Sequence, residues 1–232
     1  MSDRLTSNWT AVRAEIAAAC ERANRPVDSV RLVAVTKYAE MDWVRGLVAL
    51  GQTALGENRP QQLIERAGTL QGAEWHLIGH LQRNKVRAVL PFASCIHSID
   101  SLKLLARIGE IAGELGLTPR VLLEVNVSGE ESKDGFSAAT VRGDWPQIQA
   151  VENVTVAGLM TMAPLTDDPQ TARPVFRRLR ELRDELQASA QPGIALSELS
   201  MGMSGDFAVA IEEGSTMVRV GSRLFEGLSP TH

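Results

Sequence analysis

Short runs of apolar, mostly β-branched residues alternate along the chain with longer amphipathic stretches. The short runs predict eight strands, near residues 32–36, 53–56, 75–79, 94–98, 121–127, 155–160, 197–200 and 217–220. The stretches between them repeat apolar residues at helical spacing, for example over 41–50, 61–70, 101–115 and 171–186. A further amphipathic stretch over 5–24 precedes the first strand and predicts a leading helix.

Strands that alternate with helices in this way are typical of a closed parallel barrel. We therefore expect an α/β protein with a single (β/α)8 TIM barrel and an extra N-terminal helix. A doubly wound open sheet is the alternative, and it is disfavoured because no Gly-x-Gly-x-x-Gly motif follows any predicted strand. No linker or shift in composition divides residues 1–232, so one domain is expected.

Composition and charge exclude several classes of partner. With 44% hydrophobic and 22% charged residues, the chain has the composition of a soluble globular protein. Its net charge of −4 argues against binding to nucleic acid or to an anionic membrane, and the basic run over 82–87 is expected to be the solvated face of a helix. There is no signal-peptide core and no apolar run of membrane-spanning length. Cys20 and Cys95 lack the spacing of a disulfide framework or a zinc site, so we expect a cytoplasmic protein without a metal.

Lys37 directly follows the apolar run Val30–Thr36, at the strand end where a barrel places its functional residues. A lone ammonium is costly to remove from water, and a lysine that is partly removed from water loses its proton more easily. The neutral amine can then condense with an aldehyde to form a Schiff base. The alternative is a strand-end lysine that simply extends into water.

The loops after the last two predicted strands are rich in glycine and serine, and in this fold those loops commonly bind phosphate. The first loop, Ser200–Ser204, runs into a predicted short helix over 206–213, and the second contains Gly221 and Ser222. Opposite Lys37, the two loops predict a site for a phosphorylated aldehyde, a description that pyridoxal 5′-phosphate (PLP) meets. A helix cap and a tight turn are the alternative explanation of the loops.

Arg219 lies on the last predicted strand and is expected to project toward the barrel mouth, near the pyridine nitrogen of the cofactor. A guanidinium can only donate to that nitrogen, which leaves the ring formally neutral. An arginine at this position, in place of an acidic residue, favours storage or proton exchange over decarboxylation or transamination. The alternative is a structural salt bridge from Arg219 to Glu212 or Glu213.

Several segments between residues 30 and 226 together resemble a known family. They are Val33–Lys37, Gly56–Asn58, Trp75–Lys85, Asn126–Gly135, Gly158–Met162, Leu199–Asp206 and Gly214–Ser222. They are similar to those of the pyridoxal phosphate homeostasis protein family, which is related in fold to the barrel domain of alanine racemase. The resemblance implies that Lys37 is the Schiff-base lysine, with Asn58 at the edge of the cofactor and Arg219 at the ring nitrogen. It also implies that Ser200, Gly221 and Ser222 contact the phosphate.

These arguments together define an expected cofactor site and an atypical rim around it. The expected PLP-binding residues are Lys37, Asn58, His80, Ser200, Met201, Ser204, Arg219, Gly221 and Ser222. The chain departs from the usual family pattern at Tyr38–Glu40, at Arg59 and Pro60, and at Glu226. These differences concern the rim and any partner surface built on it.

The expected function is a PLP carrier that holds the cofactor on Lys37 and passes it to apo-enzymes by transient contact, as a monomer with little or no turnover. Only about ten residues follow the last predicted strand, so the second domain of racemases is not expected. Lys133 is a candidate second aldehyde acceptor during release. The alternatives are a slow amino-acid racemase, with Lys37 and either His80 or Tyr38 as bases, and a binding module that senses PLP.

Two further groups are assigned structural roles. His76 and His80 are four residues apart, but on a strand-to-loop segment rather than a helix, so they do not form a helical zinc pair. His76 is expected to be a core or pocket histidine with its hydrogen bonds satisfied. Methionines 160, 162, 201, 203 and 217 are expected to be mostly barrel lining.

Overall fold

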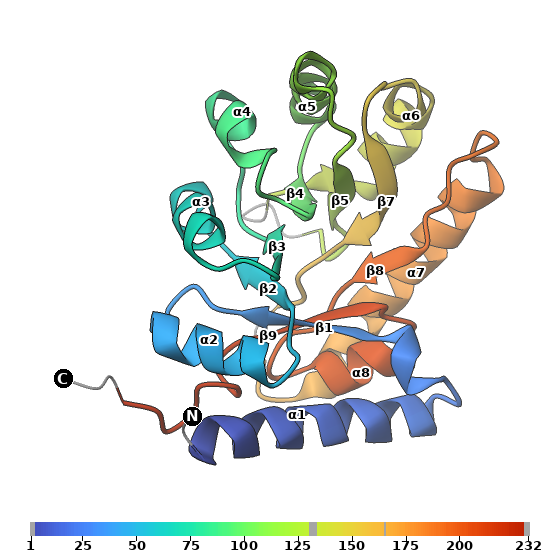
Figure 1. The fold of residues 1–232 in the computed structure, drawn as a ribbon. Coiled ribbons are helices and arrows are strands. Elements are labelled where there is room, and N and C mark those ends of the chain that lie inside the picture. Colours follow the sequence, from blue (N-terminus) through green and yellow to red (C-terminus); the bar gives the residue numbers. More distant parts are fainter. Residues whose placement is uncertain (1–2, 130–133, 165, 230–232) are drawn as a thin grey trace.

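Eight parallel strands close into a barrel in the computed structural model, which describes residues 3–129, 134–164 and 166–229 (Figure 1). The barrel strands are β1 (Arg31–Val35), β2 (Ala54–Glu57), β3 (Glu74–Leu77), β4 (Cys95–Ile99), β5 (Arg120–Asn126), β7 (Thr155–Met160), β8 (Glu198–Ser200) and β9 (Met217–Val220). Their order is β4-β3-β2-β1-β9-β8-β7-β5, and the pairing of β4 with β5 closes the ring. Because neighbouring strands run parallel, they all end at one face of the barrel. The predicted (β/α)8 barrel is confirmed.

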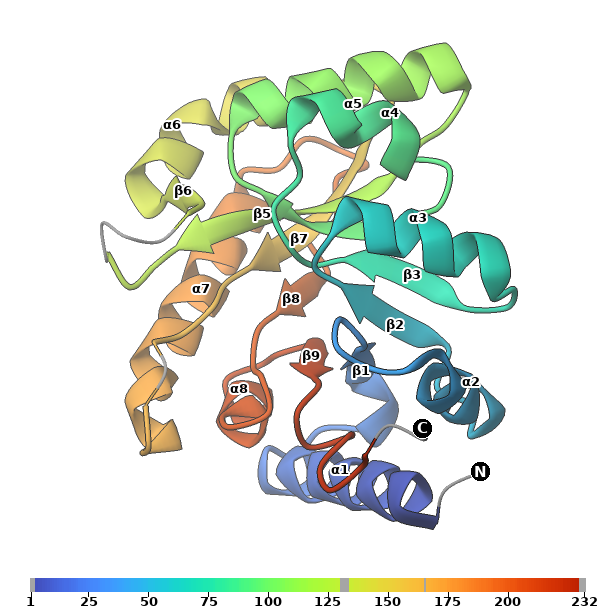
Figure 2. The ribbon, with the colours of Figure 1, turned by 90° about the vertical axis from the view of Figure 1, so that its left-hand side faces the viewer.

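Helices surround the barrel on its outer side (Figures 1 and 2). They are α1 (Asp3–Arg22), α2 (Met41–Ala49), α3 (Pro60–Thr69), α4 (Val86–Val89), α5 (Leu102–Leu115), α6 (Ala138–Gln149), α7 (Arg173–Ala188) and α8 (Phe207–Glu212). The predicted leading helix is α1, which packs against α2 and α8. Its buried residues, including Leu5, Val12 and Ile16, recur at helical spacing and therefore lie on one face.

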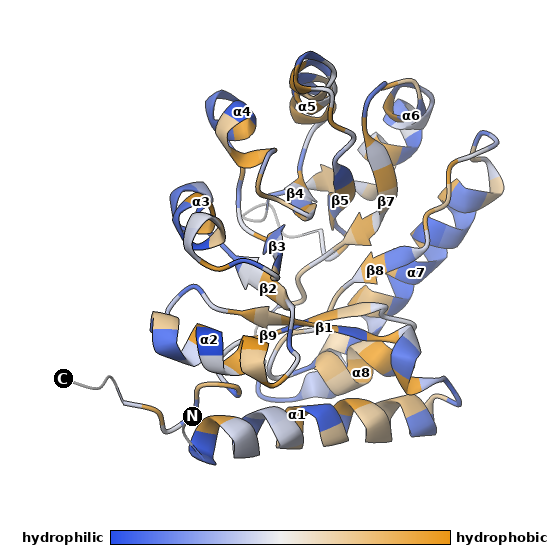
Figure 3. Ribbon diagram, in the orientation of Figure 1, coloured by the Kyte–Doolittle hydropathy of each residue, from blue (hydrophilic) through white to orange (hydrophobic). Residues whose placement is uncertain are grey.

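Burial on both faces explains the apolar composition of the strands. All five residues of β4 are buried, because one face of the strand lines the barrel interior and the other packs against helices. The helices are amphipathic instead: α7 buries Phe176, Leu179 and Leu186 and exposes charged residues on its other side. Figure 3 shows mainly hydrophobic residues along β7, β8 and β9, hydrophilic stretches on β3 and β5, and hydrophilic residues on the outer surfaces of the helices.

Three details differ from the sequence-based expectations. The strand predicted over 75–79 ends at Leu77, so residues 78–80 belong to the loop that enters the site. The basic run over 82–87 is solvent-exposed as expected, except for buried Val86, but it forms a short 3-10 turn, Arg83–Lys85, and the start of α4. The two-residue strand β6 (Phe136–Ser137), which pairs with β5 beside the ring, was not predicted because it is too short to show a period. Among the described helices, none has the length and apolar character needed to cross a bilayer.

Candidate functional site

A cavity of about 650 Å³ opens at the carboxyl ends of the barrel strands. Residues from the predicted set line this cavity, namely Lys37, Asn58, His80, Ser204, Arg219, Gly221 and Ser222. Ser200 and Met201 differ from the rest of that set. Both are fully buried, and neither is part of the cavity wall. The fold thus brings most of the predicted residues to one place, and puts these two in the interior.

Helix α3 holds the loop that carries Lys37. Arg66 donates from Nη1 to the Thr36 carbonyl at 2.7 Å and from Nη2 to the Ala39 carbonyl at 2.7 Å. Gln62 donates to the carbonyl of Lys37 itself at 3.1 Å. The backbone on both sides of Lys37 is therefore fixed, and its half-buried side chain reaches the cavity.

Glu57 at the end of β2 balances the charge of Arg66. Arg66 Nη1 lies 2.8 Å from Glu57 Oε1, and the Thr36 hydroxyl donates to the same oxygen at 2.5 Å. Glu57 is fully buried, and burial raises its pKa while the bonds from Thr36 and Arg66 act in the opposite direction. Its other oxygen, Oε2, has no hydrogen-bond partner within the described structure. The carboxylate is thus held in the interior by the Thr36 hydroxyl and by Arg66, which supplies the opposite charge.

The residues that depart from the family pattern form an exposed rim. Tyr38 is 83% exposed, and the Lys37 ammonium lies 5.2 Å from the centroid of its ring. Arg59 and Glu226 are exposed as well. Lys133, the predicted second aldehyde acceptor, lies outside the described residues.

Arg219 is buried at the floor of the cavity. Its Nη1 donates to Ser200 Oγ at 2.5 Å, and its Nη2 donates to the Thr161 carbonyl at 2.9 Å. Burial lowers its pKa to about 10, so the guanidinium stays protonated at neutral pH. The alternative salt bridge to Glu212 or Glu213 is wrong, because these carboxylates bind arginines of α1 and α7 instead.

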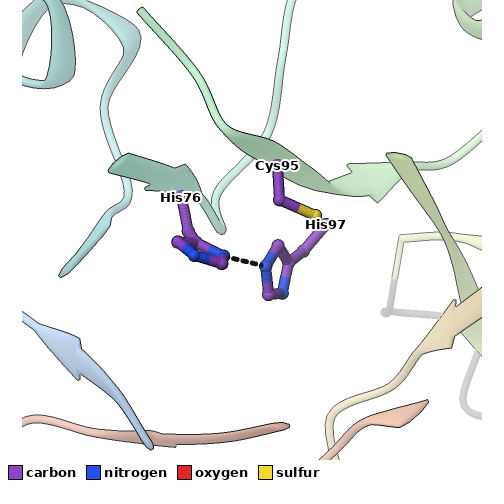
Figure 4. Close-up of side chains that lie close together, drawn as sticks. All are labelled: His76, Cys95 and His97. Atoms are coloured by element: carbon purple, nitrogen blue, oxygen red, sulfur yellow. Dashed lines mark hydrogen bonds between the residues drawn. The ribbon is translucent and has the colours of Figure 1, made fainter. Parts of the chain in front are cut away.

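Two buried histidines, His76 and His97, continue the hydrogen-bond chain from Arg219 and Ser200 through the barrel interior (Figure 4). Ser200 Oγ lies 2.9 Å from His97 Nδ1, and His97 Nε2 lies 2.9 Å from His76 Nδ1. Since a guanidinium only donates, the Ser200 oxygen accepts from Arg219. Burial lowers the pKa of His76 to about 4 and that of His97 well below its ordinary value, so both rings are neutral at pH 7. Neutral partners thus hold the cation in place.

Cys95 joins His76 and His97 in a compact group of metal-type ligands (Figure 4). One ligand atom of each lies within 4.8 Å of the others. The two facing imidazole nitrogens already bond to each other, and burial raises the pKa of the Cys95 thiol to about 12. The charges of Arg31 and Arg120 also act on His76 and oppose an added cation. We interpret the group as part of the buried hydrogen-bond chain, in which His76 Nε2 alone finds no partner among the described atoms, contrary to the expectation of a fully satisfied ring.

The loops after β8 and β9 are joined by a hydrogen bond from the Gly221 N–H to Ser204 Oγ, at 3.2 Å. Gly202, earlier in the first loop, has φ +96°, and a Cβ there would lie 2.6 Å from the Ala210 Cβ. Only glycine allows this tight approach of the loop to α8. Ser204 and Gly221 therefore face the cavity as one connected wall of small residues.

Glu124 on β5 also lines the cavity, although the sequence pattern did not single it out. Glu124 is only 7% exposed, and its carboxylate makes no hydrogen bond within the described part of the chain. Burial raises its pKa to about 7; Asp100 and Asp134 act in the same direction, while Arg219 and His80 lower it.

A signal for Glu124 was present in the strand itself. Leu122 packs in the barrel interior with Ala157 and Met160, and residues two apart on a strand share a face. Glu124 is therefore an acidic residue on the inward face of an otherwise buried strand, near its carboxyl end.

The methionines behave largely as expected. Met160, Met201 and Met217 are buried, whereas Met162 and Met203 are partly exposed and line the cavity. The thioethers thus fill the interior and provide apolar surface at the site.

The barrel and its cavity define the class of protein, and comparison with known proteins agrees. The sequence profile described as "Alanine racemase, N-terminal domain" matches residues 7–230. Alanine racemase from Clostridium difficile has a TM-score of 0.75 to this chain at 16% identity, covering 99% of this chain and 58% of the racemase. At that identity the likeness concerns the fold alone.

Relatives of similar length are considerably more alike in sequence. The "Pyridoxal phosphate homeostasis protein" of Aquifex aeolicus is 42% identical over 89% of this chain and 91% of its own length. The protein of the same name from Deinococcus radiodurans is 40% identical over 93% of this chain and 98% of its own length. The structure of PipY from Synechococcus elongatus, solved with PLP bound, has a TM-score of 0.81 at 38% identity and covers 92% of this chain and 99% of that one. The chain belongs to the pyridoxal phosphate homeostasis protein family.

Replacing Arg66 with Met is expected to lower the free energy of unfolding by about 3–5 kcal/mol at neutral pH, because Glu57 is left as a buried, unpaired charge. Denaturant unfolding measures the loss. Arg45→Met is the matched control, since it removes an exposed ion pair with Asp42 and should cost less than about 1 kcal/mol. Equal losses for the two variants would contradict the role given to Arg66.

Glu124→Gln is expected to stabilise the cofactor-free protein at high pH. The raised pKa means that the folded state holds a proton that the unfolded state has lost between pH 4.5 and about 7, so wild-type stability falls as pH rises through this window. The free energy of unfolding of the variant minus that of wild type should therefore rise by on the order of 3 kcal/mol between about pH 4.5 and about pH 8. Denaturant unfolding across that range measures the difference, with Glu74→Gln, a half-exposed glutamate paired with Arg31, as the control. Parallel pH profiles for wild type and Glu124→Gln would refute the prediction.

Proposed function

We propose that this chain binds pyridoxal 5′-phosphate in the cavity and serves PLP homeostasis by holding the cofactor and handing it on. The convergence of the Lys37 amine, the Arg219 guanidinium and the joined serine and glycine loops on one cavity is the observation that carries the proposal. The relatives' names and the PLP-bound PipY structure support the same cofactor. PLP supplies an aldehyde that condenses with primary amines and a ring that can accept electron density.

Each part of the cofactor has a matching group in the cavity. Lys37 would form the Schiff base, and Arg219, which keeps N–H donors beyond those used by its two protein partners, would face the ring nitrogen. The phosphate would lie against the connected wall formed by Ser204, Gly221 and Ser222.

Of the other predicted cofactor-binding residues, Asn58 and His80 line the cavity, whereas Ser200 and Met201 lie in the interior. Asn58 and His80 would contact the periphery of the ring. Ser200 would act through its hydrogen bond to the floor arginine rather than by touching the phosphate. Met201 would contribute packing beneath the loop.

The charges of the cavity favour holding the cofactor over turnover of amino acids. Among the described residues that line it, the basic ones are Lys37, His80 and Arg219. Lys37 would be taken by the cofactor, Arg219 is engaged at the floor, and His80 Nδ1 lies 3.3 Å from an Asp100 carboxylate oxygen. An amino-acid substrate would therefore find no free cation for its carboxylate, which disfavours the racemase alternative.

We further propose that the chain acts as a cytoplasmic monomer that meets apo-PLP enzymes transiently. The exposed rim around Tyr38 and Arg59 is the surface that such a partner would meet first. Cys20 and Cys95 are both buried free thiols, which suits a reducing compartment.

Purified protein mixed with PLP is expected to develop the visible absorbance band of a lysine-bound cofactor, and Lys37→Ala is expected to abolish it. Borohydride reduction followed by peptide mass analysis should locate the label on Lys37. Lys85→Ala, an exposed lysine in the 3-10 turn, is the control and should label normally. Labelling that persists in Lys37→Ala would overturn the assignment.

Slow or absent turnover is a separate expectation. Loaded protein incubated with L- or D-alanine in D2O should exchange the α-proton far more slowly than the about 10 s⁻¹ typical of enzymes. Proton NMR of the amino acid measures the exchange. Wash-in at such rates for either enantiomer would establish a racemase-type enzyme instead of a carrier.

A further inference from the structure

The cavity has two chemically different sides. On one side the loops after β8 and β9 present serine and glycine, suited to an anion. On the other, Glu124 and Asp134 line the wall, and the charge of Asp100 also acts on Glu124. The phosphate of PLP accounts for the first side and leaves the acidic side without an assigned ligand.

Glu124 is the centre of the acidic side. It is 7% exposed, it faces the cavity from β5, and its carboxylate makes no hydrogen bond to any described residue. Acidic side chains at the rim of a cleft are usually explained by solvation, but Glu124 is a largely buried residue whose exposed part opens on the cavity. A largely buried carboxylate without a partner is costly, and a cationic ligand would offset that cost.

The nearby cations do not satisfy that requirement. Arg219 lowers the pKa of Glu124 only partly, because its hydrogen bonds run to Ser200 and Thr161. His80 is turned to Asp100. Glu124 is thus left facing the space into which Lys37 also projects.

We propose that Glu124 forms a subsite for the ammonium group of a second primary amine, the one that takes the cofactor from Lys37. This inference rests on the proposed function and adds to it the chemical class of the acceptor. The cavity volume of about 650 Å³ leaves room for an aliphatic amine beside a cofactor of PLP's size.

Glu124 would also prepare the incoming amine for reaction. An ammonium cannot attack until it loses a proton; transfer of that proton to the carboxylate leaves a neutral amine with its lone pair and a neutral carboxylic acid, with no other reactant needed. Burial raises the pKa of Glu124 to about 7, which suits a proton acceptor working near neutral pH. The charged groups that act on Glu124 are Arg219, Asp100, Asp134 and His80, and they set this pKa together with burial. Lys37 lines the same cavity.

The charge pattern also selects among amines. An α-amino acid brings a carboxylate, which Asp134 and Asp100 repel and for which no free cation is found among the described lining residues. A lysine side chain of a protein brings only the ammonium. The acceptor expected here is therefore the side-chain amine of a recipient protein's lysine, not a free amino acid.

The test measures how fast an added amine removes the cofactor from loaded protein at about pH 8, where Glu124 is ionised. With Nα-acetyl-L-lysine amide as the probe, Glu124→Gln should lower the second-order rate constant about tenfold, the effect of losing one ion pair of about 1.4 kcal/mol. Glu124→Asp should retain part of the rate, and Glu74→Gln, at the opposite end of the barrel, should match wild type. The ratio of wild-type to Glu124→Gln rates should fall toward one as pH drops below 7.

Binding of n-butylammonium to the cofactor-free proteins, followed by saturation-transfer NMR, gives a readout independent of cofactor removal and should weaken about tenfold in Glu124→Gln. Normal loading of Lys37 with equal amine binding and equal rates in all variants would overturn the subsite while leaving the proposed function intact. Failure of wild type to load would instead reject the proposed function. L-alanine reacting as fast as the lysine amide would overturn the choice of a protein lysine as acceptor.

Discussion

The buried ion pair between Arg66 and Glu57 is the constraint on which the site depends. Lys37 sits in a loop, where backbone freedom would normally blur the position of a reactive amine. Arg66 removes that freedom by donating to the carbonyls of Thr36 and Ala39, on both sides of the lysine. A guanidinium can lie in this interior only because Glu57 supplies the opposite charge. The position of the amine is thus set by an electrostatic pair on neighbouring elements, β2 and α3.

Arg219 is positioned by different means. Its hydrogen-bond partners are a hydroxyl, a carbonyl and, through the hydroxyl, two neutral histidines. The charges of Asp206 and Glu124 also act on it and raise its pKa against the effect of burial. A cation held by neutral dipoles keeps its field available to the cavity, whereas one held by a carboxylate would lose most of it. The arginine that holds the loop is thus paired directly with a carboxylate, whereas the arginine at the cavity floor makes its described hydrogen bonds to neutral groups.

The sequence pattern predicted the barrel, most element boundaries to within a few residues, and most of the cavity lining, because strand ends in a parallel barrel must meet at one face. It could not show that the Ser200 side chain is buried in the interior. A shift of one residue at the end of a strand is enough to move a side chain from the cavity into the interior. Arg66 and His97 were missed for a similar reason. Their roles arise from contacts between elements distant in sequence, and no spacing within a single helix or strand announces them.

The unequal distribution of charge in the cavity is the basis of the proposal that the chain holds a cofactor rather than using it in catalysis. Catalysis at an amino acid needs a fixed cation for the substrate carboxylate, so that binding energy orients the reacting bond. In the described cavity, His80 lies against Asp100 and Arg219 is hydrogen-bonded at the floor, while the Glu124 carboxylate makes no hydrogen bond to a described residue. Under the proposed function, such a site would favour a bare ammonium over an amino acid. In this proposal, the fold shared with alanine racemase would favour release of the cofactor to another amine, because Glu124 on β5 presents a carboxylate to the cavity.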